Sequence, residues 1–311
     1  MSRLPYPKSI MEFQRTFQSE RDCEKYLFLS RWPDGFVCPV CGNREFYYIE
    51  KRKVFQCKNR HQTSITAGTV MHRTKTPLLA WFWAAYEMVT ETPGISALQL
   101  QRKLGLKRYE VAYNMLQKFR ASMVRHDRDR IHGTVEVDET YVGGATTGGK
   151  RGRGAKKTIV VAAVERKGRV MGRIRLRKIS DVSEASLLNF IQDVIEPGSY
   201  VETDGFSSYR NLRKHGYKHR PIAPDDVDIQ LPKAHLVFSN LKTWLRGTFH
   251  GVSPKHLQAY LNEFVFRFNR RKTPMAAFQT LLGLSTHVTK WPEYRTLYKG
   301  KWIHPNEPKV A

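Results

Sequence analysis

Acids, cysteines and long apolar runs are all scarce in this chain of 311 residues. Asp and Glu together number 28 against 53 Lys and Arg, which gives a formal net charge of +25. A basic excess of this size favours a nucleic-acid partner; a membrane-surface protein is the weaker alternative, because no basic amphipathic helix or anchoring segment stands out. No stretch approaches the roughly 18 apolar residues of a membrane span, and "MSRLPYPKSI" lacks the apolar core of a signal peptide. We therefore expect a cytoplasmic protein without membrane contact.

The few cysteines are concentrated near the N-terminus, three of them in "CPVCGNREFYYIEKRKVFQCKNRH". This segment reads as C-x2-C, a strand-rich interval and then C-x3-H, a spacing that is typical of metal ligands rather than disulfides. A closed Cys3His set of this kind is typical of structural zinc. The predicted ligands are Cys38, Cys41, Cys57 and His61.

Two further residues near this segment have alternative interpretations. His72 could replace His61 as the fourth ligand, but it lies eleven residues further along the chain. Cys23 precedes the cluster within "SERDCEKYLFLSRW", and we interpret it as a packed helix residue. Between the ligand pairs, "EFYYIE" and "KVFQC" are predicted to form the strands of a hairpin.

Residues 76–130 have helical patterning. "TPLLAWFWAAYEMVTE" predicts a buried helix, and "PGISALQLQRKLGLKRYEVAYNMLQKFRASM" resembles a helix-turn-helix with Ser96 as a cap and a break at Gly105. A plain helical hairpin is the alternative. The residues that the second helix would offer to DNA are Lys107, Arg108, Tyr109 and Asn114.

From Gly133 the apolar period changes to that of strands. "GTVEVDETYVGG" alternates, "KKTIVVAAVER" is a nearly continuous apolar strand, and "GRVMGRIRLRKIS" follows as its hairpin partner. "SEASLLNFIQDVIEPG" predicts a helix, and "SYVETDGFSSYRNL" predicts a strand that ends at Asp204. The predicted order is strand, strand, strand, helix, strand.

Two acids in this order could meet at one edge of a sheet. If the first and last strands pair, Asp138 and Asp204 come together although 66 residues separate them. Converging carboxylates bind hard cations such as Mg²⁺, and two such ions can support phosphoryl transfer on DNA. The alternatives are that Glu136, Asp138 and Glu139 are solvent-facing strand residues, and that the aspartates are only turn formers.

A glycine-rich basic loop, Gly143 to Lys157, follows the first aspartate. It could become ordered on DNA phosphates beside the metal site, or it could be a solvated loop. Its basic residues are Lys150, Arg151, Arg153, Lys156 and Lys157.

Several motifs together resemble the bacterial insertion-sequence transposases that carry an N-terminal zinc ribbon and an ISXO-type catalytic domain. They are "FVCPVCG", "TSITAGTVMH", "VEVDETYVGG", "VETDGFSSY" and "NLKTWLRGTFHGVSPKHLQAYLNEFVFRFNRR", in the expected order from about Glu12 to about Leu282. The resemblance implies an RNase H-like core of the DDE superfamily, catalytic Mg²⁺ or Mn²⁺, and DNA cleavage followed by strand transfer. The implied fold is a multidomain α+β protein, with a zinc ribbon (1–75), a helix-turn-helix-like region (76–130), a catalytic domain (131–285) and a basic tail (286–311).

The resemblance assigns the first two catalytic positions to Asp138 and Asp204 and makes Glu139 a neighbour rather than a ligand. At the third position, where many members carry a glutamate seven residues before a lysine, this chain has His235 before Lys242. Three candidates follow: His235 by register, then Asn240, then Glu263.

Basic residues near the C-terminal half are predicted to contact the DNA backbone. Lys242 and Arg246 share one helix face, with a solvated face as the alternative, and Arg270 and Arg271 lie in "FRFNRRK". Because this chemistry needs no protein nucleophile, Tyr141 is interpreted as a packing residue.

The sequence thus predicts a nucleoid-associated transposase that binds double-stranded DNA, namely element ends and target, as a homo-oligomer. An inactive DNA-binding regulator and a nuclease that never joins ends are the rival interpretations.

Overall fold

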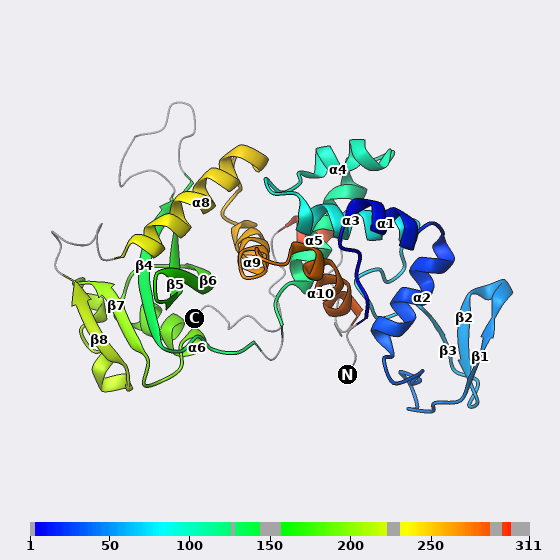
Figure 1. The fold of residues 1–311 in the computed structure, drawn as a ribbon, viewed down its shortest axis with the longest axis horizontal. Helices are drawn as coiled ribbons and strands as arrows, with labels where there is room; N and C mark the ends of the chain where they lie inside the picture. Colours follow the sequence, from blue (N-terminus) through cyan, green and yellow to red (C-terminus); the bar gives the residue numbers. More distant parts are fainter. Residues whose placement is uncertain (1–3, 126–127, 144–156, 223–230, 287–293, 300–311) are drawn as a thin grey trace. The chain divides into compact units, whose positions relative to one another are not determined.

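The computed structural model describes residues 4–125, 128–143, 157–222, 231–286 and 294–299 (Figure 1). The chain divides into two compact units. The first holds the described residues of Met1–Met123 and Arg270–Tyr298, and the second holds those of Val124–Asn269 together with Lys299. Most of the predicted 76–130 region therefore lies in the same unit as the ribbon segment, and residues 270–285 also belong to this first unit rather than to the unit that contains the five-stranded sheet.

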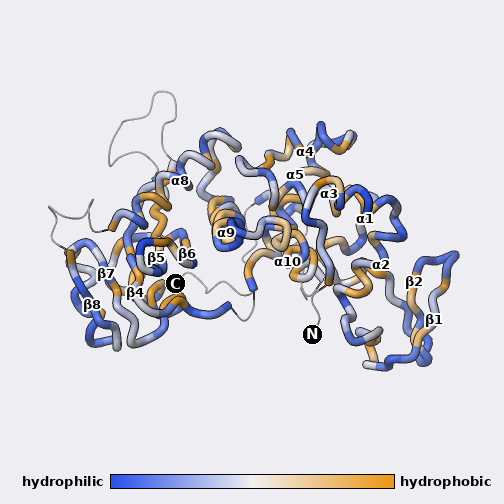
Figure 2. The backbone as a smooth tube through the Cα atoms, in the orientation of Figure 1, coloured by the Kyte–Doolittle hydropathy of each residue, from blue (hydrophilic) through white to orange (hydrophobic). Residues whose placement is uncertain are grey.

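Helices dominate the first unit. They are α1 (Ile10–Thr16), α2 (Glu20–Arg31), α3 (Leu78–Thr90), α4 (Ala97–Leu104), α5 (Tyr109–Ser122), α10 (Pro274–Thr286) and α11 (Tyr294–Tyr298). Helix α3 is apolar on nearly every side, which requires burial all round. The α10 residue Phe278 is fully buried, with its ring centroid 5.6 Å from that of Phe13 and 6.0 Å from that of Phe82. In Figure 2 the tube through α10 is mostly in hydrophobic colours, as this packing requires.

The ribbon is a small antiparallel sheet of β1 (Phe46–Ile49), β2 (Val54–Cys57) and β3 (Gln62–Ser64), in that order. The predicted hairpin is confirmed, with Lys53 in the left-handed region (φ 49°) at its turn. Strand β3 was not predicted. Phe55 of β2 packs its ring against Trp32, just past α2, with centroids 5.5 Å apart.

Helices α4 and α5 form the predicted helical pair. The Ser96 side chain accepts a hydrogen bond from Gln99 N at 3.2 Å, so it caps α4 as expected. Gly105 adopts φ 60° and ends the helix, because this left-handed conformation suits glycine. Lys107, Arg108 and Tyr109 are exposed at the start of α5.

The second unit is built on a five-stranded mixed sheet. Its strands are β4 (Thr134–Val142), β5 (Thr158–Lys167), β6 (Val170–Ile179), β7 (Tyr200–Asp204) and β8 (Lys218–Ile222). The order is β6-β5-β4-β7-β8; β5 runs antiparallel to both neighbours, while β4, β7 and β8 are parallel. If the five strands are numbered 1 to 5 along the chain, their order across the sheet is 3-2-1-4-5. This is the mixed sheet that the RNase H-like prediction requires. That prediction is confirmed, although β8 itself was not foreseen.

Helices cover both faces of this sheet (Figure 1). Helix α6 (Glu184–Val194) packs on the face that holds Val135 and Val137, whereas α8 (Pro232–Phe249) and α9 (Leu257–Phe268) pack on the opposite face. Because side chains alternate along a strand, the even-numbered residues of β4 point toward α8. Among the described residues, no helix is both long and apolar enough to cross a bilayer.

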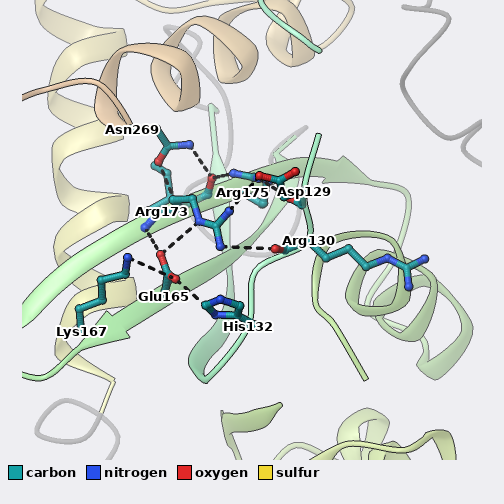
Figure 3. Close-up of polar contacts among 9 residues, drawn as sticks. Asp129, Arg130, His132, Glu165, Lys167, Arg173, Arg175 and Asn269 are labelled. Atoms are coloured by element: carbon teal, nitrogen blue, oxygen red, sulfur yellow. Dashed lines mark hydrogen bonds and ion pairs between the residues drawn. The ribbon is translucent and has the colours of Figure 1, made fainter. Parts of the chain in front are cut away.

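Strand β6 holds both ends of the second unit (Figure 3). Arg175 Nη2 donates to the carbonyl of Asp129 at 2.7 Å, so the segment that enters the unit is fixed there. The Asn269 side chain accepts from Ile174 N at 2.8 Å and donates to Ile174 O at 3.2 Å, so the end of the unit is fixed at the same strand. Both ends of the Val124–Asn269 segment are therefore held by the same strand.

Strand β8 contributes a buried histidine whose titration is testable. His219 Nε2 lies 2.9 Å from Thr203 Oγ1, and burial, followed by the charge of Arg213, lowers the pKa of His219 below 6.5. The unfolded chain then binds the proton more readily, so this contribution to stability is present above pH 6.5 and is lost as pH falls below it.

We expect His219→Gln to reduce the loss of unfolding free energy between pH 8 and pH 5. Urea unfolding at several pH values would measure it. The same pH dependence in both proteins would show that His219 contributes nothing. The exposed His132→Gln serves as the control, because its ring is largely in solvent.

Candidate functional site

The two predicted aspartates lie at matching positions on neighbouring parallel strands. Thr134 of β4 pairs with Tyr200 of β7, and Glu136 pairs with Glu202. The same register, continued by two residues, relates Asp138, the fifth of the nine residues of β4, to Asp204, the last residue of β7, and the charge of Asp204 raises the pKa of Asp138. Asp138 is only 8% exposed and Asp204 is half-buried. Parallel pairing thus brings together two acids that are distant in sequence.

Helix α8 places an imidazole on the first of these aspartates. His235 Nε2 lies 3.2 Å from Asp138 Oδ2, while the other oxygen, Oδ1, accepts a hydrogen bond from Glu139 N at 2.8 Å. Burial raises the pKa of Asp138 to about 6; the Glu139 amide and His235 lower it, and the charge of Asp204 raises it. Burial and a neighbouring carboxylate both destabilise the charged form of an acid, and a bound cation stabilises that form. This arrangement therefore suits a divalent metal.

The three candidates for the third position have different surroundings. His235 contacts Asp138 directly. Asn240 is five residues further along α8, which rotates it by about 140° around the helix, and it is exposed. Glu263 is fully buried in α9, where it lies 3.8 Å from Arg267. The contact with Asp138 therefore favours His235.

The acid next to Asp138 has another partner. Glu139 accepts a hydrogen bond from the Tyr209 hydroxyl at 2.7 Å, and burial raises its pKa to about 7. Being odd-numbered, Glu139 lies on the α6 side of β4, opposite Asp138. Tyr141, on that same side, is 54% exposed, so its interpretation as a packing residue is wrong. It lies beyond Val137, the last residue of β4 in the core beneath α6.

Four possible metal ligands converge in the first unit. One ligand atom from each of Cys38, Cys41, Cys57 and His61 lies within 4.8 Å of all the others. Cys57 Sγ is 3.8 Å from Cys41 Sγ and 3.6 Å from His61 Nδ1. Zinc–sulfur bonds of about 2.3 Å in a tetrahedron separate the sulfurs by about 3.7 Å, so the spacing fits zinc. His72 instead accepts a hydrogen bond from Gly68 N through Nδ1, at 3.2 Å, and it lies outside this cluster.

Two family models match the segments that contain these sites. Residues 18–62 match the transposase zinc-ribbon domain, and residues 130–269 match the ISXO2-like transposase domain. The chain carries a transposase zinc ribbon and an ISXO2-like transposase domain. The resemblance that the sequence motifs suggested is therefore confirmed.

Solved structures add only distant likenesses. One is a pre-cleavage Mos1 transpososome, at 14% identity and a TM-score of 0.29, covering 67% of this chain and 79% of that chain. Another is a simian T-cell lymphotropic virus intasome in complex with PP2A regulatory subunit B56 gamma, at 12% identity and a TM-score of 0.30, covering 57% and 66%. TM-scores this low carry no weight, so the fold assignment depends on the strand order. No curated protein matches the chain.

Basic side chains of the transposase domain extend the site along α8. Lys242 Nζ donates to Thr140 Oγ1, two residues beyond Asp138 on β4, at 2.8 Å. Burial and the charge of Lys157 lower the pKa of Lys242, while Asp138 raises it. Arg246 follows one turn later and is exposed. His235, Lys242 and Arg246 therefore form one stripe on α8, because their spacings of seven and four residues are close to whole helical turns.

The other residues predicted to contact DNA lie outside α8. Lys157 and Arg271 are exposed, whereas Arg270 and Asn114 are half-buried. Arg270 and Arg271 begin the part of the first unit that contains α10. Lys150, Arg151, Arg153 and Lys156 lie outside the described residues.

Sequence reasoning missed one residue of the transposase domain. The strand pattern offers Glu136 only as a possible solvent-facing acid, but it is 0% exposed and accepts two backbone hydrogen bonds from the start of α8. The available signal was its position two residues before Asp138, which places both side chains on one face of β4.

Proposed function

We propose that this protein is a DDE-type transposase of a bacterial insertion sequence. It would cleave DNA at the 3′ ends of its element and join the freed ends to target DNA, with Mg²⁺ or Mn²⁺ as cofactor. The observation that supports this most directly is the contact of His235 with Asp138, an acid whose pKa the charge of Asp204 raises, within a chain segment that matches a transposase family model.

Each residue of the site has a distinct role in this proposal. Asp138 and Asp204 would hold divalent cations, and bound cations would supply Lewis-acid activation of a water or a 3′-hydroxyl and stabilisation of the leaving oxygen. His235 supplies a ligand nitrogen or holds a proton beside Asp138. Lys242 and Arg246 bind backbone phosphates that lie along α8, because their side chains are exposed on the same stripe.

The first unit would bind the ends of the element. Zinc held by the Cys3His cluster would keep the ribbon folded, and Lys107 and Arg108 would contact DNA from the start of α5. Two DNA ends must be held together for joining, so we expect a homo-oligomer on double-stranded DNA, acting at the nucleoid.

A cleavage and joining assay on the DNA that flanks this gene, with Mg²⁺ or Mn²⁺, tests the proposal. Joined products that require the metal support a transposase. Breakage without joining indicates a nuclease, and tight DNA binding without any breakage indicates an inactive regulator.

The third catalytic position can be tested within the same assay. We expect His235→Ala to reduce cleavage by about 100-fold or more, the usual effect of removing a group that handles protons in catalysis. Asn240→Ala should remain within about threefold of wild type, because its side chain is on another side of α8. A loss of cleavage in the Asn240 variant, with the His235 variant active, would reverse the assignment.

A further inference from the structure

We propose that Glu136 is a positioning residue that fixes the first turn of α8 and thereby holds His235 against Asp138. This inference builds on the proposed function, because it concerns the geometry of the same site. It assigns a role to a buried acid that neither metal binding nor DNA contact requires.

The carboxylate of Glu136 is bound to the backbone of α8. Its Oε2 accepts hydrogen bonds from Lys233 N and Ala234 N, each at 3.0 Å. Its Oε1 makes no hydrogen bond among the described residues and lies 3.8 Å from Arg166 Nε and 3.9 Å from Lys233 Nζ. These two cations and the two amides offset part of the cost of burying the charge, although burial still raises the pKa of Glu136.

Within the described part of the chain, the start of α8 has no side-chain cap from its own N-cap residue. The N-cap residue is Leu231, whose side chain cannot accept a hydrogen bond, and Pro232 in the first turn has no N–H. The free amides that follow belong to Lys233 and Ala234, and both are satisfied by Glu136. A carboxylate at a helix N-terminus is also favoured by the helix dipole. Glu136 therefore takes the place of a local cap, from a strand almost 100 residues away in sequence.

This bond connects β4 to α8 beside the reacting groups. Glu136 and Asp138 lie on one face of β4 at successive same-face positions, about 7 Å apart along the strand. Ala234 and His235 are consecutive in α8, and His235 N makes an intrahelical bond to Leu231 O at 3.2 Å. Glu136 is two residues from Asp138 on β4, and the amides it binds directly precede His235 on α8. The bonds from Glu136 to α8 therefore set the position of His235 relative to Asp138.

The chain contains a matched control. Glu202 occupies the equivalent position on β7, two residues before Asp204 and in register with Glu136. It is 4% exposed and pairs with Arg166 and with Arg220, the latter at 3.3 Å. Glu202→Ala therefore removes an equally buried acid with ionic partners but leaves the amides of α8 bound.

Amide hydrogen exchange in the metal-free full-length protein tests the structural step without depending on activity. In Glu136→Ala, the protection of the Lys233 and Ala234 amides should fall by at least about tenfold, because both lose their acceptor. Glu136→Gln keeps an oxygen in the accepting position and should retain most of the protection. Glu202→Ala should retain it fully. Unchanged protection in Glu136→Ala would overturn the proposal, and so would an equal loss in Glu202→Ala.

Cleavage kinetics test the consequence for His235. Glu136→Ala should lower kcat by about 10- to 100-fold with KM for DNA unchanged, because a small misplacement of a reacting group has effects of this size. Glu136→Gln should recover kcat to within about fivefold of wild type, a rescue not expected of a metal ligand. On a His235→Ala background, Glu136→Ala should add less than about threefold.

The failing outcomes are distinct. An additive effect on the His235→Ala background, or a glutamine variant without activity, would show that Glu136 does not act through His235. If Glu136→Ala does not fold, the exchange and kinetics of Glu136→Gln decide, with loss of protection or of rescue counting against the proposal. If wild type shows no metal-dependent cleavage, the proposed function fails while the exchange experiment still decides whether Glu136 fixes α8.

Discussion

Replacing Asp138 with asparagine should abolish metal-dependent DNA cleavage, with a loss of about 1000-fold or more, corresponding to roughly 4 kcal/mol of lost transition-state stabilisation. The amide keeps the size of the carboxylate but cannot supply the charge that a pair of divalent ions requires. Asp204→Asn should have the same effect. Gel assays of strand cleavage, with binding of the same DNA measured in parallel, would separate lost chemistry from lost binding.

The metal-free Asp138→Asn protein should also be more stable than wild type at neutral pH. Burial raises the pKa of Asp138 to about 6, so its ionisation destabilises the fold progressively as pH rises from about 4 to about 6. Glu139→Gln is the control for the cleavage measurement, because the Glu139 carboxylate accepts a hydrogen bond from Tyr209 instead of facing His235. It should keep cleavage within about tenfold of wild type. Normal cleavage by Asp138→Asn would contradict the assignment of the site.

Removing a cysteine of the ribbon should cause the second large effect. We expect Cys57→Ala to lose the bound zinc and unfold β1–β3, because a structural zinc site of this size supplies about 10 kcal/mol or more of folding free energy. Metal content by mass spectrometry and the dispersion of ribbon signals in NMR spectra would measure it. DNA binding that depends on the ribbon should fall with it.

A buried cysteine outside the cluster provides the matched control for this experiment. Cys23 is fully buried in α2, and burial raises the pKa of its thiol, so it is not poised to bind metal. Cys23→Ala should retain one zinc ion per chain and a folded ribbon, with a modest loss of stability. Retained zinc in Cys57→Ala, with His72 shown to supply a ligand, would contradict the proposed ligand set.

The apolar pattern of the sequence was enough to predict those strands in which the apolar residues are also the buried ones. Strand β4 alternates apolar and acidic residues, and β5 is apolar throughout, so both could be predicted. Strand β8 could not be, because "KHRPI" is short and charged, contains Pro221, and buries only His219 and Ile222. The packing of α10 with α3 could not be predicted either, because it depends on contacts between segments far apart in the chain.

The site shows the same division between local and long-range information. Asp138 and Asp204 could be paired from the predicted strand order, because pairing of the first and last predicted strands brings their residues side by side in one sheet. The position of His235 came from the family register, and its contact with Asp138 required the path of α8. The role of Glu136 could not be read from the sequence, because no local pattern shows which distant amides a buried carboxylate will satisfy.

The attachment of both ends of the second unit to β6 has a consequence for how the chain is synthesised. The segment between Val124 and Asn269 is an insertion within another unit, and the ribosome must complete it before α10 emerges. Until then the N-terminal residues lack Phe278, the ring that fills their aromatic core between Phe13 and Phe82. The helical unit therefore begins first but gains α10 only after the Val124–Asn269 segment, both ends of which are held at β6, has been synthesised.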